Sequence, residues 1–364
     1  ITINGSGISS NGAIYFESGN NTYSGAITLG SNSTITSAAG NQTISGTTDG
    51  GYSLSITDAG GHWYHRGVIG GTSAPTSLNI NGGIVDLYAA VKTSGAINVL
   101  ASDYIYIEGD ITITDASQNL YFKAVDEVNQ REFSTIQTNG GSVVFWANSD
   151  GDTEEWDLIK TGKIDTDGGH VWLGGSLFNN DSRIWNGLTV GSGYAYSSIH
   201  AAVALRGNID TRTTGDSSIG GDVWIAGEAG SAQYGDIASE GAVRAIYAGN
   251  GDIALITHSF VHQNANSYQT NLDTTGQISI APASGMDWHD SGFTFNYILN
   301  GSRFEGANNV DGVHINSFSN IGGLNLGTYN GTGVEGDTSY VASNDNSITI
   351  SNGITINGPI SIYG

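Results

Sequence analysis

Two short segments place an aromatic and a polar residue at alternate positions: His170 with Trp172, and Asp222 with Trp224. The residues between and after them are apolar in both segments. Successive side chains of a strand point to opposite faces, so inward apolar residues leave these four on the outward face. Tryptophans in line on an outward face suit stacking on sugar rings or on a partner surface. The four residues are therefore candidate ligand-binding residues.

A second arrangement of the same residues is possible. The segment 176–200 interrupts the strand rhythm and is long enough to fold back over its neighbours. If it does, Trp172 and Trp224 are buried and offer no exposed surface to a ligand. The sequence leaves both arrangements open.

Acidic residues gather in the segment 150–155, where Asp150, Asp152 and Glu154 offer the oxygen ligands that Ca²⁺ prefers. The full twelve-residue calcium loop is absent, because no bidentate Glu closes the segment at the required distance. These residues form a weak calcium candidate, and the alternative is a solvated acidic loop.

Histidines occur in two close pairs. His62 and His65 are three residues apart, which places them on opposite faces of a strand, whereas His258 and His262 are four apart and share a face. No third metal ligand is apparent beside the second pair. We therefore predict no metal site at the histidines.

Carboxylates that an enzyme acting on polysaccharides could use occur at scattered positions. Arg and Lys are scarce, and none forms a clear stripe beside these carboxylates. Serine nucleophile motifs, phosphate-binding loops and zinc signatures are absent. We predict that the protein is not an enzyme and needs no cofactor, and keep polysaccharide degradation as the alternative. The candidate residues are Asp165, Asp167, Asp210, Asp287, Asp290 and His289.

These residues lie within a repeated pattern, clearest in Ile164–Gly175, that runs apolar-x-Thr/Ser-x-Gly and continues x-apolar-x-apolar. Each copy predicts a short strand, a glycine corner and a second strand with one apolar face. A unit that small cannot bury its apolar side alone, so copies must stack on one another. The copies begin at Ile8, Val91, Ile136, Ile164, Ile237 and Leu272, with a degenerate one at Ile209.

Strands of four or five residues recur between turns rich in Gly, Asn and Ser, and no helical period competes with them. Three such strands occupy about 25–30 residues, one turn of a three-sided parallel β-helix. We predict an all-β chain, a single continuous right-handed β-solenoid over 1–364, with loops at its corners and its least regular part at 282–345.

The amino-acid composition indicates which classes of binding partner are unfavourable for this chain. The 364 residues include 55 Gly and no Cys, and 34 acidic against 11 basic residues give a net charge of −23. That charge disfavours nucleic acid and anionic membranes. No apolar run approaches the ~18–20 residues of a membrane span. We predict neither nucleic-acid binding nor membrane insertion.

The repeated Ile-x-Thr-x-Gly-Gly-x-Val-x-Leu pattern resembles giant exoproteins of the filamentous-haemagglutinin type, and residues 19–29 resemble the strand repeat of autotransporter passengers. The resemblance covers most of 1–280. It implies a right-handed β-helix, secretion, and adhesive or structural work at the bacterial cell surface. Expected partners are cell-surface glycans or proteins, or further copies in a fibre. It transfers no catalytic residues, and we expect the chain to be an internal fragment.

Overall fold

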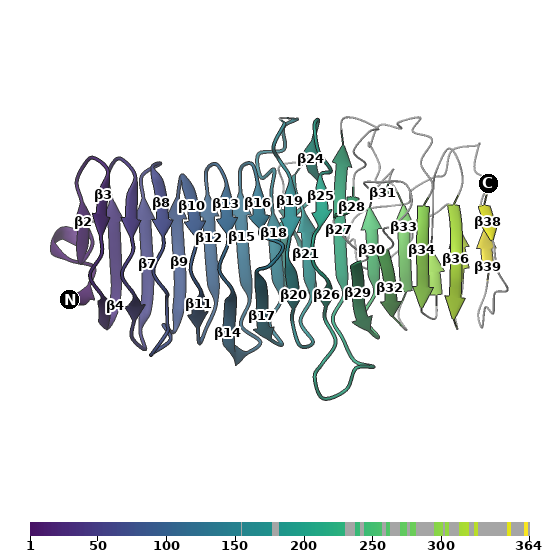
Figure 1. Cartoon of the computed structure of the whole chain (residues 1–364), viewed down its shortest axis with the longest axis horizontal. Coiled ribbons are helices and arrows are strands. Elements are labelled where there is room, and N and C mark those ends of the chain that lie inside the picture. Colours follow the sequence, from purple (N-terminus) through teal and green to yellow (C-terminus); the bar gives the residue numbers. More distant parts are fainter. Residues whose placement is uncertain are drawn as a thin grey trace.

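The computed structural model describes residues 1–153, 155–176, 182–229, 237–240 and 244–256, and beyond residue 256 it describes strands alone. The described chain is all-β and elongated, with its strands side by side along the long axis (Figure 1). It contains one short 3-10 turn, η1 (Ile8–Ser10), and no α-helix. No described helix is long and apolar enough to span a membrane.

Three long parallel sheets, here called A, B and C, contain almost all of the described strands. Sheet A holds β2 (Ile14–Phe16), β4 (Ile27–Ser37), β7 (Ser53–Asp58), β9 (Ser77–Gly82), β12 (Ile97–Ala101), β15 (Leu120–Ala124), β18 (Val143–Trp146), β21 (Val171–Gly174), β27 (Val223–Ala229), β30 (Ile253–Ile256), β33 (Gln277–Ala281), β35 (Arg303–Glu305), β37 (Leu324–Leu326) and β39 (Ile360–Ile362).

Sheet B holds β3 (Asn21–Tyr23), β5 (Gln42–Ile44), β8 (His62–His65), β10 (Ile84–Leu87), β13 (Ile105–Ile107), β16 (Val128–Gln130), β19 (Ile159–Thr161), β25 (Val203–Leu205), β28 (Ile237–Ser239) and β31 (Phe260–His262). Sheet C begins with β1 (Thr2–Gly5), the first part of β4 and β6 (Thr48–Asp49), and continues through β11 (Val91–Thr93), β14 (Ile111–Ala116), β17 (Thr135–Asn139), β20 (Lys163–Asp165), β26 (Ile209–Asp210), β29 (Arg244–Gly249), β32 (Thr270–Thr274), β34 (Phe295–Asn300), β36 (Val313–Ser319) and β38 (Ile348–Ile350).

Through most of the described chain, consecutive strands pass from sheet A to B to C and back to A, so each repeat of three strands pairs in parallel with the next. The pairing keeps equivalent positions aligned: Leu78 pairs with Leu54 on one side and Ile97 on the other. The prediction of short strands whose apolar positions recur once per repeat is confirmed. The predicted irregular part, 282–345, falls largely outside the described residues.

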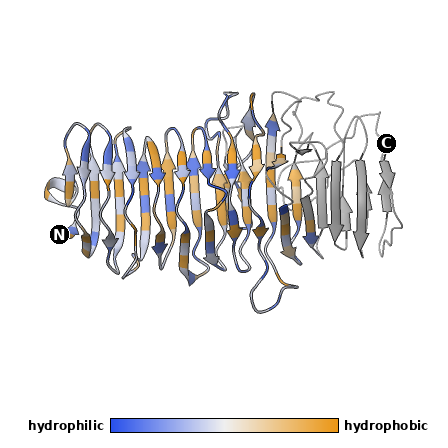
Figure 2. Cartoon of the chain, viewed as in Figure 1, coloured by the Kyte–Doolittle hydropathy of each residue, from blue (hydrophilic) through white to orange (hydrophobic). Residues whose placement is uncertain are grey.

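The interior is filled by Ile, Val and Leu from alternate positions of all three sheets. Figure 2 shows these hydrophobic positions recurring across successive strands. Val171, Leu173 and Ile164 are fully buried, as their alternation predicts. Phe122 and Phe145 pair in register and stack with ring centroids 5.7 Å apart. Burying each such side chain contributes roughly 1.5–3 kcal/mol of hydrophobic free energy, so every added repeat contributes further stabilisation of the fold.

The Thr of the repeated pattern is a buried hydrogen-bond donor at the corner between sheets C and A. Thr166 donates from Oγ1 to the carbonyl of Gly169 at 2.6 Å, and Thr211 donates to that of Gly221 at 2.6 Å. Thr93 makes the same bond to Gly95. A corner carbonyl that turns inward has no strand partner, and the hydroxyl satisfies it.

Two copies of the pattern do not share this place. Ile8 belongs to the 3-10 turn and is 89% exposed, and Ile237 begins a strand of sheet B rather than sheet C. Their equivalence to the other copies was wrong, because a pattern of four common residues recurs at more than one corner. Structural position, and not the pattern alone, decides which copies stack.

Glycines stack on one another at the corner between sheets C and A. A Cβ at Gly169 would lie 2.1 Å from the carbonyl oxygen of Gly141, and one at Gly221 would lie 2.3 Å from that of Gly169. These distances are far below any real carbon contact, so only glycine lets successive repeats come this close. The second Gly of the Gly-Gly pair is therefore required by stacking and not only by the turn.

Candidate functional site

The candidate tryptophans belong to a second apolar cluster that lies outside the interior, on the outward side of sheet A. Trp172 and Trp224 pair in register on β21 and β27, and their rings stack at 5.1 Å with only 4° between the planes. A hairpin of two antiparallel strands, β22 (Ser182–Trp185) and β23 (Leu188–Gly191), contributes to the same cluster. The buried members are Val144, Trp146, Trp172, Trp185, Val190, Tyr194, Trp224, Ala226 and Ala254.

Trp172 is 0% exposed and Trp224 is 3% exposed. The expectation of exposed tryptophans is therefore wrong, and the alternative, a segment that folds back over them, is correct. The alignment of the two rings was predicted correctly. Exposing aromatic surface to water costs free energy, and the hairpin residues Trp185 and Val190 pack into the cluster that shields the two rings from solvent. A free ligand has no open aromatic platform here.

His170 and Asp222 fasten the hairpin to the sheet. The backbone N–H of Asp222 donates to His170 Nδ1 at 2.8 Å, and Asn186 at the hairpin tip donates from Nδ2 to Asp222 Oδ2 at 2.7 Å. The His170 ring also meets the Trp185 ring edge to face at 5.6 Å. Burial lowers the pKa of His170, although the Asp222 carboxylate opposes that shift. These two predicted ligand residues thus hold the hairpin and are half-buried.

Trp185→Ala is expected to release the hairpin and expose Trp172 and Trp224 to water. Removing a buried Trp costs about 3–5 kcal/mol, and Trp185 is the largest hairpin side chain in the cluster. Tryptophan emission should shift to longer wavelength and acrylamide quenching should rise, while the main unfolding transition of the sheets stays close to wild type. Ile184→Ala is the matched control, because Ile184 lies on the same strand and is 53% exposed. Equal spectra for both variants would contradict the assigned role.

A second group of aromatic side chains lies on the outward side of sheet B, over β8, β10, β13 and β16. We call it the tyrosine face and define it by the residues that share this surface. The register aligns Tyr64 of β8 and Tyr106 of β13 with Asp86 of β10, and Arg131 and Phe133 follow the end of β16. The tyrosine face comprises His62, Tyr64, Arg66, Tyr88, Tyr104, Tyr106, Arg131 and Phe133.

Contacts within the tyrosine face fix its side chains. The His62 and Tyr64 rings stack at 3.7 Å, and His62 Nε2 lies 2.8 Å from Asp86 Oδ2. Arg66 lies 4.4 Å above the Tyr88 ring centroid. Arg66 itself is exposed, as is Arg131, and Phe133 is 61% exposed. The result is a pre-ordered surface of aromatic rings and two guanidinium groups that the interior does not need.

The tyrosine face was not predicted from the sequence, although its signal is present there. Most outward positions near the N-terminal end of the chain are Ser, Thr or Asn, whereas Tyr64 and Tyr106 occupy equivalent outward positions in sheet B, since both align with Asp86 of the strand between them. The signal becomes visible only when register is known, because the repeats differ in length. The predicted placement of His62 and His65 on opposite faces is confirmed: His62 points out and His65 is buried.

The carboxylates proposed for catalysis are only partly brought together. Asp165 and Asp210 pair in register on sheet C. Arg212 binds Asp210 through two hydrogen bonds of 2.6 and 2.9 Å, and Lys163 Nζ lies 3.6 Å from Asp165. Each of these two carboxylates therefore has one basic partner, but Lys163 lies two residues before Asp165 and Arg212 two residues after Asp210, so the two cations form no stripe.

The remaining catalytic candidates do not join this pair. Asp167 instead accepts a bond from the backbone N–H of Thr214 at 2.6 Å. Asp287, His289 and Asp290 lie outside the described residues, and so do the side chains of His258 and His262. The described carboxylates are thus tied into ion pairs and loop contacts.

The acidic segment folds onto a buried carboxyl group, Asp157. Desolvation raises the pKa of Asp157 to about 8, helped by a hydrogen bond with Asp152 and by the charges of Asp152, Asp126 and Asp150. Two carboxyl groups that hydrogen-bond to each other hold one proton between them. No group of three or more metal-ligating side chains occurs among the described residues, and Glu154 of the calcium candidate lies outside them.

Comparisons of the chain with protein-family models, with curated proteins and with solved structures return no match.

Proposed function

We propose that the protein is a structural and adhesive segment of a bacterial surface or secreted fibrous protein, built as one right-handed parallel β-helix. The cyclic order of strands through sheets A, B and C supports the β-helix. Parallel strands joined by crossovers are right-handed in nearly all proteins. Such a stack is stiff and presents long outward faces, which suits a spacer that carries binding surfaces outside the cell.

The tyrosine face carries the adhesive part of the proposal. Tyr, Arg and Phe are among the residue types enriched at protein interfaces, and Tyr and Arg are enriched at their energetic centres. Here they are pre-ordered by mutual stacking, so little side-chain entropy is lost on binding. The polypeptide of a cell-surface protein, or of a second copy, fits this composition.

Replacing both Tyr106 and Arg131 by Ala is expected to weaken attachment of protein-coated beads to target cells at least tenfold. Truncating hot-spot residues costs about 2 kcal/mol or more each, whereas an exposed Tyr elsewhere contributes little. Tyr52→Ala is the control, because Tyr52 is 44% exposed and lies outside the tyrosine face. Mild protease treatment of the cells should abolish wild-type attachment. Attachment that is absent for wild type, or equal for both variants, would refute the proposal.

Polysaccharide degradation is the alternative function. Its best-placed residues are Asp165 and Asp210, of which Asp210 is held by Arg212. Incubation with neutral and acidic polysaccharides, followed by assays for reducing ends and for unsaturated products, distinguishes the two functions. Product formation that Asp210→Asn abolishes would favour the enzyme.

A further inference from the structure

Two columns of outward side chains run along sheet A over β4, β7, β9, β12 and β15. Both columns begin with hydroxyl side chains and continue with amides; the first then ends in an aromatic residue, and the second in an apolar residue followed by a cation. The first column is Thr34, Ser55, Asn79, Asn98 and Tyr121, and the second is Thr36, Thr57, Asn81, Leu100 and Lys123. Neither column contributes to the interior, whose residues alternate with them.

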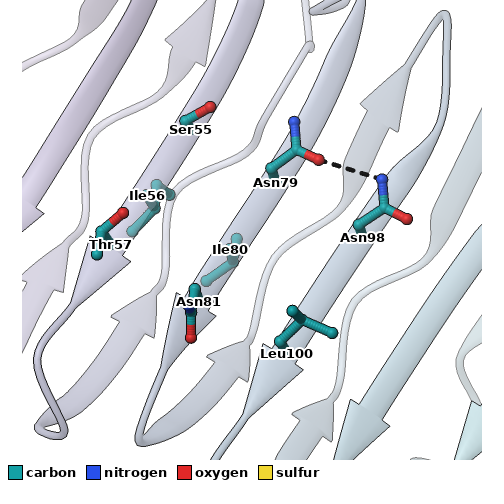
Figure 3. Close-up of a pocket in the computed structure, with 8 residues that line it drawn as sticks. All are labelled: Ser55, Ile56, Thr57, Asn79, Ile80, Asn81, Asn98 and Leu100. Atoms are coloured by element: carbon teal, nitrogen blue, oxygen red, sulfur yellow. Dashed lines mark hydrogen bonds between the residues drawn. The ribbon is translucent and has the colours of Figure 1, made fainter. Parts of the chain in front are cut away.

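A hollow of about 230 Å³ lies where the amide part of the columns meets Leu100. Figure 3 shows the amide side chains of Asn79 and Asn98 side by side above the strands, with Asn81 and Leu100 in the second column. Small Ser and Thr side chains on β7 and a larger Leu100 on β12 leave this space open. We call it the asparagine hollow. Its lining residues are Ser55, Ile56, Thr57, Asn79, Ile80, Asn81, Asn98 and Leu100.

The amides of the asparagine hollow keep unused hydrogen-bonding groups. Asn98 donates from Nδ2 to Asn79 Oδ1 at 3.1 Å, which leaves the Asn79 Nδ2 and Asn98 Oδ1 groups available. Asn81 is exposed and makes no side-chain hydrogen bond to another described residue. An amide offers both donors and an acceptor, as a ligand hydroxyl requires. The hollow thus combines matched polar groups with one exposed apolar side chain, Leu100, which is 41% exposed.

We propose that the asparagine hollow binds a neutral oligosaccharide of pyranose rings that lies along the two columns. Successive repeats stand ~4.8 Å apart, close to the length of one sugar residue in an extended chain, so each repeat meets about one ring. The amides of Asn79, Asn81 and Asn98 bind hydroxyl groups, and Leu100 packs against the C–H face of a ring. The half-buried Tyr121 continues the first column beyond Asn98.

The charge around the hollow selects a neutral ligand. None of the lining residues is charged, and the chain carries a net charge of −23. The nearest column cation, Lys123, lies 3.8 Å above the Trp146 ring and points into the tryptophan cluster. An anionic glycan would find no counter-charge among the lining residues, and the net charge of the chain would repel it. The hollow lies on a different sheet from the tyrosine face, so this inference stands apart from the proposed function.

Calorimetric titration with cellohexaose, mannohexaose and a hexamer of galacturonic acid tests the inference. At least one neutral hexasaccharide should bind at millimolar concentration or below, and the acidic hexamer should not. Leu100→Asp and the double variant Asn81→Ala with Asn98→Ala should each weaken neutral binding at least tenfold. Outward side chains tolerate these changes, and an unchanged thermal unfolding curve verifies that the variants fold. If Leu100→Asp does not fold, Leu100→Ala is measured in its place.

Two controls make the outcome decisive. Gln137→Ala removes an exposed amide at an outward position of sheet C, and Tyr106→Ala alters the tyrosine face; both should bind as wild type. Failure of both neutral hexasaccharides to bind, tighter binding of the acidic hexamer, or equal binding by the hollow variants overturns the inference. Bead attachment that persists in those cases shows that only the asparagine hollow, and not the adhesive role, has failed.

Discussion

Gly169→Ala is expected to lower the free energy of unfolding by about 3 kcal/mol or to prevent folding. The added methyl group would lie 2.1 Å from the Gly141 carbonyl oxygen, which is backbone and cannot rotate away. The corner cannot shift the other way either, because Gly221 of the next repeat packs against the Gly169 carbonyl. Urea unfolding followed by far-ultraviolet circular dichroism measures the loss.

Gly215→Ala is the matched control for this prediction. Gly215 is exposed, and a Cβ there would meet no atom within 4 Å. Its unfolding free energy should stay within about 0.5 kcal/mol of wild type. If both alanine variants unfold at the same urea concentration, close glycine stacking does not limit the corner.

His65→Leu is expected to stabilise the protein and to make it less sensitive to acid. His65 is buried between Ile44 and Leu87 of the neighbouring strands, and neither of its ring nitrogens has a hydrogen-bond partner among the described residues. Desolvation lowers its pKa from 6.5 to about 4. Leu fills the same space without a polar group to desolvate, so a gain of about 1–2 kcal/mol is expected at pH 7.

The effect should grow as the solution becomes acidic. Below pH 6.5 the unfolded chain takes up a proton at His65, whereas the folded chain does not until about pH 4. The unfolded state therefore binds more protons, and this residue costs a further ~3 kcal/mol of stability across that interval. The difference between His65→Leu and wild type, from urea titrations at several pH values, isolates it from other groups. A difference that is constant from pH 7 to pH 4 would rule out this account.

Alternation predicted the interior well, because one inward position in two is a strong constraint when every strand is short. It placed Ile164, Val171 and Leu173 correctly. It gave no reason for Thr166, whose hydroxyl serves a corner carbonyl that only the folded chain reveals. It also treated Ile8 and Ile237 as equivalent to Ile164, because sequence spacing does not state which sheet a strand joins.

The sequence predicted which residues of the candidate site align with one another, but it did not decide whether they are exposed or buried. Register between Trp172 and Trp224 follows from the repeat itself, whereas their burial depends on a hairpin that belongs to neither strand. The tyrosine face and the asparagine hollow share another difficulty. Residues such as Tyr64 and Asp86 are 22 positions apart in the sequence and become neighbours only through pairing. Local sequence patterns therefore predict on which face of a strand a residue lies. The pairing register of the folded chain decides which residues from different strands come together to form a site.

The hairpin has a mechanical consequence. Backbone hydrogen bonds between repeats run along the long axis, so a pulling force along that axis acts directly on them. Under such a force the terminal repeat separates first, and the others follow one by one. Trp146, Trp172 and Trp224 belong to three successive strands of sheet A, and the hairpin residue Trp185 packs into the same cluster. The hairpin therefore links these three repeats through side-chain packing. When the chain is pulled from one end, repeats should unfold singly at low force until the hairpin is reached, where a larger force is required.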